Sequence, residues 1–76
     1  MKSKIGQYFH FLQNGMIKNQ GLVLAPDRAQ LFEWVLGEPS DVIKINAAFF
    51  ANCNFYATAE EMDLAFQKEH HHAENH

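Results

Sequence analysis

The residues that could do chemistry in this chain are mostly histidines, and most of these are at its C-terminus. From Glu69 onward the sequence reads Glu-His-His-His-Ala-Glu-Asn-His. On a helix, His72 and His76 are four positions apart, a spacing at which two imidazoles can hold one metal ion. A terminal segment supplies none of the surrounding hydrogen bonds that orient the ligands of a tuned site. We therefore expect residues 70–76 to form a frayed, solvated tail, and we predict no metal site and no cofactor.

The other polar residues form no arrangement that is typical of an active site. His10 lies between Phe9 and Phe11 and has no visible partner that would make it a general base. The acidic residues at 60, 61 and 63 suit the first turn of a helix, where the helix dipole favours acids. The serines and Thr58 lack the turn of a catalytic nucleophile, and the glycines form no phosphate-binding loop. We predict no catalytic residues and no enzymatic activity.

Length and composition indicate one small folded domain. The chain has 76 residues, 47% of them apolar, with seven phenylalanines, two tyrosines and one tryptophan. This content predicts a folded globule over residues 1–69, although a domain of this size has a thin margin of stability. An internal disulfide cannot add to it, because Cys53 is the single cysteine, and its position indicates a small buried hydrophobe. Association with a partner chain is one way to supplement the stability.

Charge and hydropathy argue against nucleic acids and membranes as binding partners. The formal net charge is −3 and the six basic residues are scattered, whereas nucleic-acid binding rests on Lys and Arg side chains that neutralise phosphates. No apolar run approaches the roughly 20 residues that cross a bilayer. Gln7, His10, Gln13 and Asn14 interrupt any stretch that resembles a signal sequence. We therefore predict a cytoplasmic protein that binds neither nucleic acid nor membrane.

The strongest pattern in the chain is an alternation between residues 43 and 57. Every odd position there is apolar and most even positions are polar. A period of two predicts a β-strand with one buried face. A continuous strand of this length would span about 50 Å, whereas a domain of this size has a diameter on the order of 30 Å. The strand must therefore bend, fold back through a longer turn near 46–48 or 52–54, or project beyond its own sheet.

A first helix is predicted over residues 27–36. Asp27 can cap its first turn, and Gln30 completes a capping-box pattern. The apolar residues at 31, 32, 35 and 36 share one stripe of such a helix. Gly37 and Pro39 are placed to end it.

A second helix is predicted to begin at Thr58. Thr58 and Glu61 form a capping box, and a narrow apolar stripe follows at 62, 65 and 66. We expect this helix to fray after Glu69 or His70, because chain ends are poorly held.

Two interpretations remain open for the N-terminal third. Residues 5–13 and 16–24 flank Asn14-Gly15, a strong signal for a tight β-hairpin. The same stretch also places Ile5, Phe9 and Leu12 on one helical stripe, with Gly15 inside it. We favour the hairpin, because aromatic residues at 8, 9 and 11 are more common in strands.

These elements predict the order β-β-α-β-α and the α+β class. The sheet is expected to be small and antiparallel, with an N-terminal hairpin and one long central or edge strand, and two helices pack on it. An overhanging apolar strand would recruit another chain. We therefore predict a homodimer through the long strand, and partner-binding residues on its even-numbered face: Phe50, Asn52, Asn54 and Tyr56.

The function that fits this description is a non-enzymatic protein-interaction module, such as a regulator, an inhibitor or an accessory subunit. The alternative is a small-molecule or metal-binding protein that uses an aromatic cleft or the histidine-rich tail. A compact enzyme assembled across a dimer interface is a third hypothesis.

Overall fold

Five antiparallel strands form a single sheet, in the order β4-β3-β2-β1-β5. The structure is a computed structural model that describes residues 4–34 and 36–74, with only the backbone described for residues 70–74. The strands are β1 (Tyr8–Gln13), β2 (Met16–Ala25), β3 (Arg28–Phe32), β4 (Pro39–Lys44) and β5 (Cys53–Tyr56), and the helices are α1 (Ala47–Ala51) and α2 (Ala59–Glu74). The α+β class and the antiparallel sheet packed by two helices agree with the prediction.

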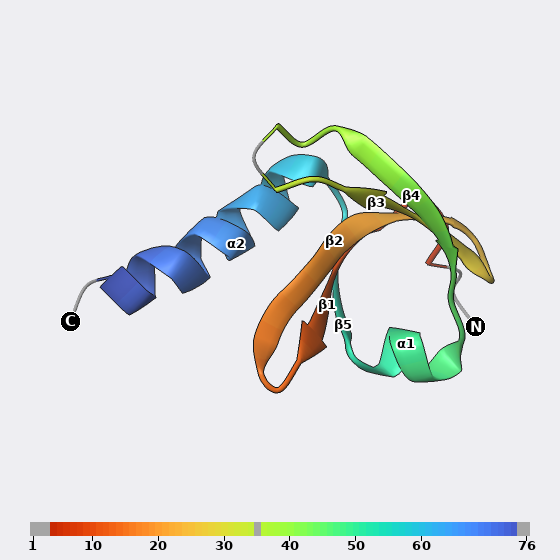
Figure 1. Cartoon of the computed structure of the whole chain (residues 1–76), viewed down its shortest axis with the longest axis horizontal. Coiled ribbons are helices and arrows are strands. Elements are labelled where there is room, and N and C mark those ends of the chain that lie inside the picture. The colour runs from red at the N-terminus through yellow and green to blue at the C-terminus, as the bar shows by residue number, and fades with distance from the viewer. Residues whose placement is uncertain (1–3, 35, 75–76) are drawn as a thin grey trace.

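The two helices lie on opposite sides of the sheet (Figure 1). The sheet is strongly curled, and α1 joins the two edge strands, β4 and β5, across the inside of the curl. Helix α2 follows β5 and lies against the outer side of the sheet, where its main contacts are with β1 and β5. The far end of α2 extends beyond the sheet.

The main core fills the space between the sheet and α1. Its buried members come from three strands and the start of the α1 connection: Phe9, Val23, Ala29 and Ile45. Half-buried apolar residues pack around them: Phe11, Leu31, Ile43, Phe49, Phe50, Cys53 and Phe55. The Phe49 ring on α1 stacks on Phe11 with 4.4 Å between centroids and meets Phe9 edge-on at 5.4 Å. These ring contacts hold α1 against the inner side of the sheet.

The N-terminal hairpin is confirmed. Strand β1 pairs with β2, and Gln13 lies opposite Met16 across the turn. Asn14 and Gly15 both have positive φ, 55° and 77°, as a two-residue type I′ turn requires. The competing interpretation of this segment as a helix is therefore wrong.

The helix predicted over residues 27–36 is instead β3 and the turn after it. Ala29 and Leu31 point into the core, and Leu31 lies opposite Gly21 of β2. Pairing on both sides, with β2 and β4, overrides the local helical pattern of these five residues. Gly37 (φ 68°) turns the chain as expected, but the chain then enters β4 at Pro39 rather than leaving a helix.

The prediction that residues 43–57 are extended, whether as one strand or with a bend or turn, is wrong over residues 47–51. The chain leaves the sheet after Lys44, forms α1 and returns as β5. The side-chain oxygen of Asn46 accepts a hydrogen bond from the backbone N–H of Phe49 at 2.9 Å, which caps the first turn of α1. Two alanines, the residue with the highest helix propensity, follow this cap. The element order is therefore β-β-β-β-α-β-α, with two more strands before the first helix than predicted.

The second helix is confirmed at its start. The Thr58 hydroxyl accepts a hydrogen bond from the backbone N–H of Glu61 at 3.2 Å, as the capping box predicts. Glu60 and Glu61 lie in the first turn, at the positive end of the helix dipole. The backbone of α2 remains helical to Glu74, beyond the end expected at Glu69 or His70.

Candidate functional site

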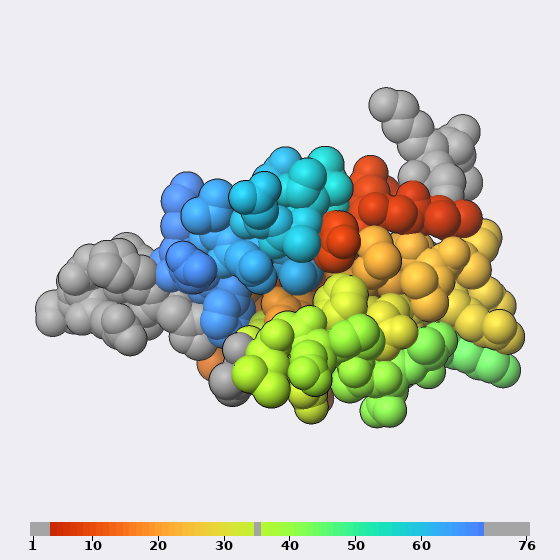
Figure 2. All heavy atoms as spheres, turned by 90° about the horizontal axis from the view of Figure 1, so that it is seen from above, coloured from red at the N-terminus to blue at the C-terminus, as the bar shows by residue number. Residues whose placement is uncertain are grey.

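The outer side of the sheet is covered by α2 over only part of its width. One row of directly opposite residues crosses all five strands on this side: Val42, Gln30, Leu22, Tyr8 and Tyr56. Helix α2 lies over the β1 and β5 end of the row, which leaves the β2, β3 and β4 end to solvent. Figure 2 shows this exposed end as the surface that runs from β2 (orange) to β4 (green).

Two large apolar side chains stand out of this exposed surface. Val42 on β4 is 54% exposed and Leu24 on β2 is 45% exposed. Their chain neighbours Ile43 and Val23 point the other way, into the core. Strand β4 is thus apolar on both sides at this point, although only one side is covered. We call this surface the open face and define it by six residues: Leu22, Leu24, Arg28, Gln30, Val42 and Lys44.

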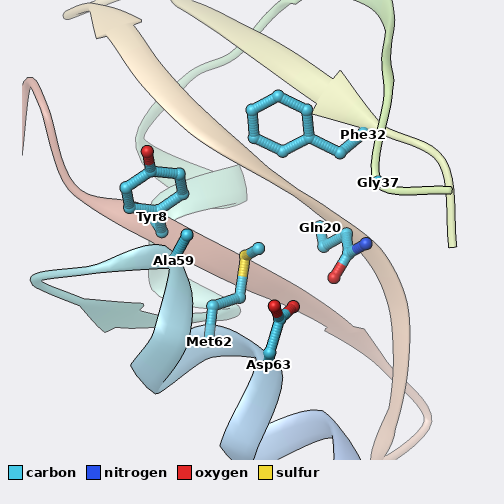
Figure 3. Close-up of a pocket in the computed structure, with 7 residues that line it drawn as sticks. All are labelled: Tyr8, Gln20, Phe32, Gly37, Ala59, Met62 and Asp63. Carbon is cyan, nitrogen blue, oxygen red and sulfur yellow. The ribbon is translucent and has the colours of Figure 1, made fainter.

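A pocket adjoins the open face where the sheet meets α2. It has a volume of about 240 Å³ and is lined by Tyr8, Gln20, Phe32, Gly37, Ala59, Met62 and Asp63. We call it the α2 pocket. Its residues come from β1, β2, β3, the β3–β4 connection and the first turns of α2 (Figure 3). In Figure 2 the blue helix and the yellow-green β3–β4 segment face one another across it.

Aromatic and apolar groups make up most of the pocket. The rings of Tyr8 and Phe32 stack with 6.2 Å between centroids and 28° between their planes. Met62 is 3% exposed and lies between the helix and the sheet. Beside the pocket, the Trp34 ring stacks on Phe66 of α2 at 4.8 Å. This contact links the β3–β4 connection to the helix.

A buried histidine lies beneath α2. His10 on β1 is fully buried, and a hydrogen bond of 3.1 Å joins its Nδ1 to the hydroxyl of Tyr56 on β5. Its Nε2 is buried without a hydrogen-bond partner. Burial lowers the pKa of His10 from 6.5, whereas Glu69, Asp63 and the neighbouring Gln20 act in the opposite direction. The neutral imidazole is therefore the form that the fold favours.

This burial predicts a stability that depends on pH. The unfolded chain binds a proton on His10 near the ordinary histidine pKa, whereas the folded chain resists it. We therefore expect full stability above about pH 6.5 and progressive loss as the pH falls through the lower folded pKa. Urea unfolding across this pH range measures the effect. His10→Phe should flatten the profile, and an equally steep fall in parent and variant would show that His10 is not its cause.

The four residues predicted to bind a partner do not share one surface. Phe50 lies on α1 and packs against Phe55 in the core, with 5.7 Å between ring centroids. Asn52 ends α1, and its side chain donates a hydrogen bond within that helix. Asn54 and Tyr56 do lie together, on β5 opposite β1. The Tyr56 hydroxyl is hydrogen-bonded to the buried His10. Phe50 lies on the other side of the sheet, with α1, and is separated from Asn54 and Tyr56.

The single cysteine of the chain is half-buried and unreactive. Burial raises the pKa of the Cys53 thiol to about 12, and its Sγ donates a hydrogen bond to the backbone oxygen of Phe49 at 3.2 Å. The thiol is therefore protonated at neutral pH. Within the described residues, no group of three or more His, Cys, Asp or Glu side chains could hold a metal ion. His72 and His76, the predicted metal-binding spacing, lie outside the described side chains.

No protein-family model matches the chain, and no curated protein or solved structure matches it. Among the described residues, no helix combines the length and the apolar content of a membrane span.

Proposed function

We propose that this chain is a small non-enzymatic protein-interaction module, and that a second copy of the chain binds to its open face. The observation that carries the proposal is the exposure of Val42 and Leu24 on the outer side of the sheet. Apolar side chains gathered on one uncovered sheet face are a feature of interaction surfaces. A domain of 76 residues also gains from burying more apolar area, because its own core is small.

The face, rather than the edge, of β4 is the proposed contact. Strand β4 begins at Pro39, which has no N–H to offer a neighbouring strand, and ends at Lys44. Proline and lysine on an edge strand both discourage pairing with another strand. The sequence predicted association through a long strand that the chain does not form. We therefore propose the open face as the contact instead.

The absence of catalysis is proposed from the state of the two groups best suited to it. His10, the natural candidate for a general base, is fully buried beneath α2. Cys53, the natural nucleophile, is held as a thiol by its raised pKa. Both side chains serve the packing of the sheet against its two helices.

Sedimentation equilibrium tests the self-association. Val42→Glu places a charge on the open face, on a side chain that is already half exposed, so the fold is retained. We expect this change to raise the dimer dissociation constant by about tenfold or more, because a buried charge would lose its water. Circular dichroism confirms the fold of the variant.

Leu64→Glu is the matched control. Leu64 is 61% exposed on α2 and lies outside the open face. It should leave the dissociation constant unchanged. A parent chain that stays monomeric at millimolar concentration would contradict the proposal, as would equal losses from both variants.

Binding of a small ligand is the second candidate function, because the α2 pocket is a defined cavity with aromatic and apolar walls. Its volume of about 240 Å³ lies below the roughly 300–1,000 Å³ that holds drug-sized ligands. A single side chain or a small organic ion is the largest occupant that such a cavity fits.

A further inference from the structure

We propose that the α2 pocket binds one guanidinium group, and that Arg28 of a second copy of the chain supplies it. The assignment of Arg28 as the source of the guanidinium rests on the proposed self-association. The preference of the pocket for that group rests on its own walls and acceptors.

The walls of the pocket suit the flat face and the carbon stem of an arginine side chain. Tyr8 and Phe32 form a stacked aromatic pair at 6.2 Å, and guanidinium groups stack on aromatic rings. Ala59 and Met62 add an apolar side from α2. Such a surface covers the methylene stem of an arginine while the charged end reaches polar groups.

Two residues that carry hydrogen-bond acceptors, Gln20 and Asp63, line the same part of the pocket. The Gln20 side chain is buried, and its Nε2 donates to the backbone oxygen of Glu33 at 3.3 Å. This bond fixes the amide so that its oxygen lies on the other side, toward the carboxylate of Asp63 (Figure 3). The Gln20 side chain also acts on His10, whose pKa it raises. Asp63 therefore supplies the acceptor that is open to a donor from outside, and a guanidinium offers five donors in a planar fork.

Asp63 has no cation of its own in the described part of the chain. The interaction that involves its charge there is with His10, whose burial favours the neutral form. Asp63 is exposed at the mouth of the pocket, and a cation that enters the pocket would meet this carboxylate. The pocket is therefore complementary in charge as well as in shape.

The open face presents a suitable cation. Arg28 and Lys44 lie directly opposite one another on β3 and β4, so two positive charges adjoin at the far end of this face. Like charges opposite one another are unfavourable unless an acid approaches them. Arg28 shares a face of β3 with Phe32, which lines the pocket four residues, or about 13 Å, along the strand.

A two-fold axis near the centre of the open face would pair both Arg28 side chains with both α2 pockets. In a two-fold dimer the same patch meets itself in reversed direction. An axis close to Gln30, midway between residues 28 and 32 of β3, would place Arg28 of each copy over the α2 pocket of the other. Val42 and Leu22, which lie in one row with Gln30 across the strands, would then meet their counterparts between the two charged contacts.

The chemistry of the pocket is tested by nuclear magnetic resonance with three probes: N-acetyl-arginine amide, its neutral citrulline analogue, and N-acetyl-lysine amide. At millimolar concentration, the arginine probe should shift the amide signals of Gly37, Met62 and Asp63, the citrulline probe should not, and the lysine probe should shift them less. Asp63→Asn should abolish the shifts. Glu61→Gln, which removes one charge from the same helix turn, should retain them. Equal shifts from arginine and citrulline, or unchanged shifts in Asp63→Asn, would overturn the guanidinium site.

The source of the guanidinium is tested by exchanging the two charges. Arg28→Glu and Asp63→Lys should each weaken dimerisation by about tenfold or more in sedimentation equilibrium. The double variant should recover most of the lost affinity, because the pair is restored with reversed sign. Two single losses that simply add in the double variant would exclude Arg28 as the occupant.

The two proposals fail in distinguishable ways. A parent chain that is monomeric but binds the arginine probe at Gly37, Met62 and Asp63 would remove self-association and Arg28 while supporting the pocket. A dimer that Val42→Glu disrupts but that responds to neither probe nor charge exchange would support the open face and remove the guanidinium site.

Discussion

Gly21→Ala is expected to cost about 3 kcal/mol or more of folding free energy. Gly21 lies in the middle of β2, between Phe9 of β1 and Leu31 of β3. A Cβ added there would overlap the backbone oxygen of Gln30 and would lie 2.8 Å from the Phe9 ring. The backbone oxygen belongs to the neighbouring strand and cannot turn aside, so the sheet itself would have to shift. Urea unfolding followed by circular dichroism measures the loss.

The control for this prediction is Gly15→Asn. Gly15 has open space around it and a φ of 77°, which asparagine adopts more readily than most residues. We expect a loss of about 1 kcal/mol or less. A Gly21→Ala variant that is as stable as Gly15→Asn would mean that β2 does not approach β3 and Phe9 as closely as described.

Phe9→Ala is expected to cost about 3–5 kcal/mol, the range for removing a fully buried phenylalanine. The Phe9 side chain has no exposed area and lies at the centre of the core. Its ring also meets Phe49 of α1 edge-on, so the change removes part of the surface that holds this short helix. For a small domain whose total stability is on the order of 5 kcal/mol, such a loss approaches unfolding.

The control for this second prediction is Met16→Ala. Met16 starts β2 beside the hairpin turn and is 67% exposed. Its replacement should change the unfolding free energy by about 0.5 kcal/mol or less. Comparable losses at positions 9 and 16 would contradict the placement of the core between the sheet and α1.

Local sequence signals predicted the parts of the fold that depend on local chemistry. Asn14-Gly15 fixes a tight turn because both residues tolerate positive φ, and the turn sets the pairing of β1 with β2. The cap at Thr58 likewise starts α2 through one hydrogen bond to Glu61. Neither feature requires knowledge of the rest of the chain, and both are found as expected.

Strand β3 was missed because its sequence supports two structures equally well. The residues at 31, 32, 35 and 36 form a helical stripe, while Ala29 and Leu31 form the inward side of a strand. The choice is made by distant residues, since β2 lies on one side of β3 and β4 on the other. Long-range pairing of this kind leaves no mark in a short sequence window.

The segment 43–57 was misjudged because a short helix imitates a period of two. Ile45, Phe49 and Cys53 all belong to the core side, although a helical turn separates the first from the last. Asn46 before two alanines was the available signal for that turn, since asparagine is a favoured helix cap. The strand pattern on either side outweighed it.

The candidate site depended on this same segment, and the structure divides its four residues between two places. Asn54 and Tyr56 share the outer side of β5, but Phe50 turns into the core from α1. The residues of the open face were not anticipated. Val42 beside Ile43 was the signal that could have found them, because two adjacent apolar residues in a strand point to opposite sides. When both sides of a strand carry apolar residues, each side is expected to be covered either by the protein itself or by a binding partner.

Contacts between two copies can be observed directly in a mixed sample, in which one half of the protein carries isotope labels and the other half carries none. Isotope-filtered nuclear Overhauser spectra of this sample report only contacts that cross from one copy to the other. The proposed association predicts cross-copy signals among the methyl groups of the open face, which belong to Val42, Leu22 and Leu24. A spectrum without cross-copy signals, or one whose signals involve Leu64 on α2 instead, would contradict the open face as the binding surface.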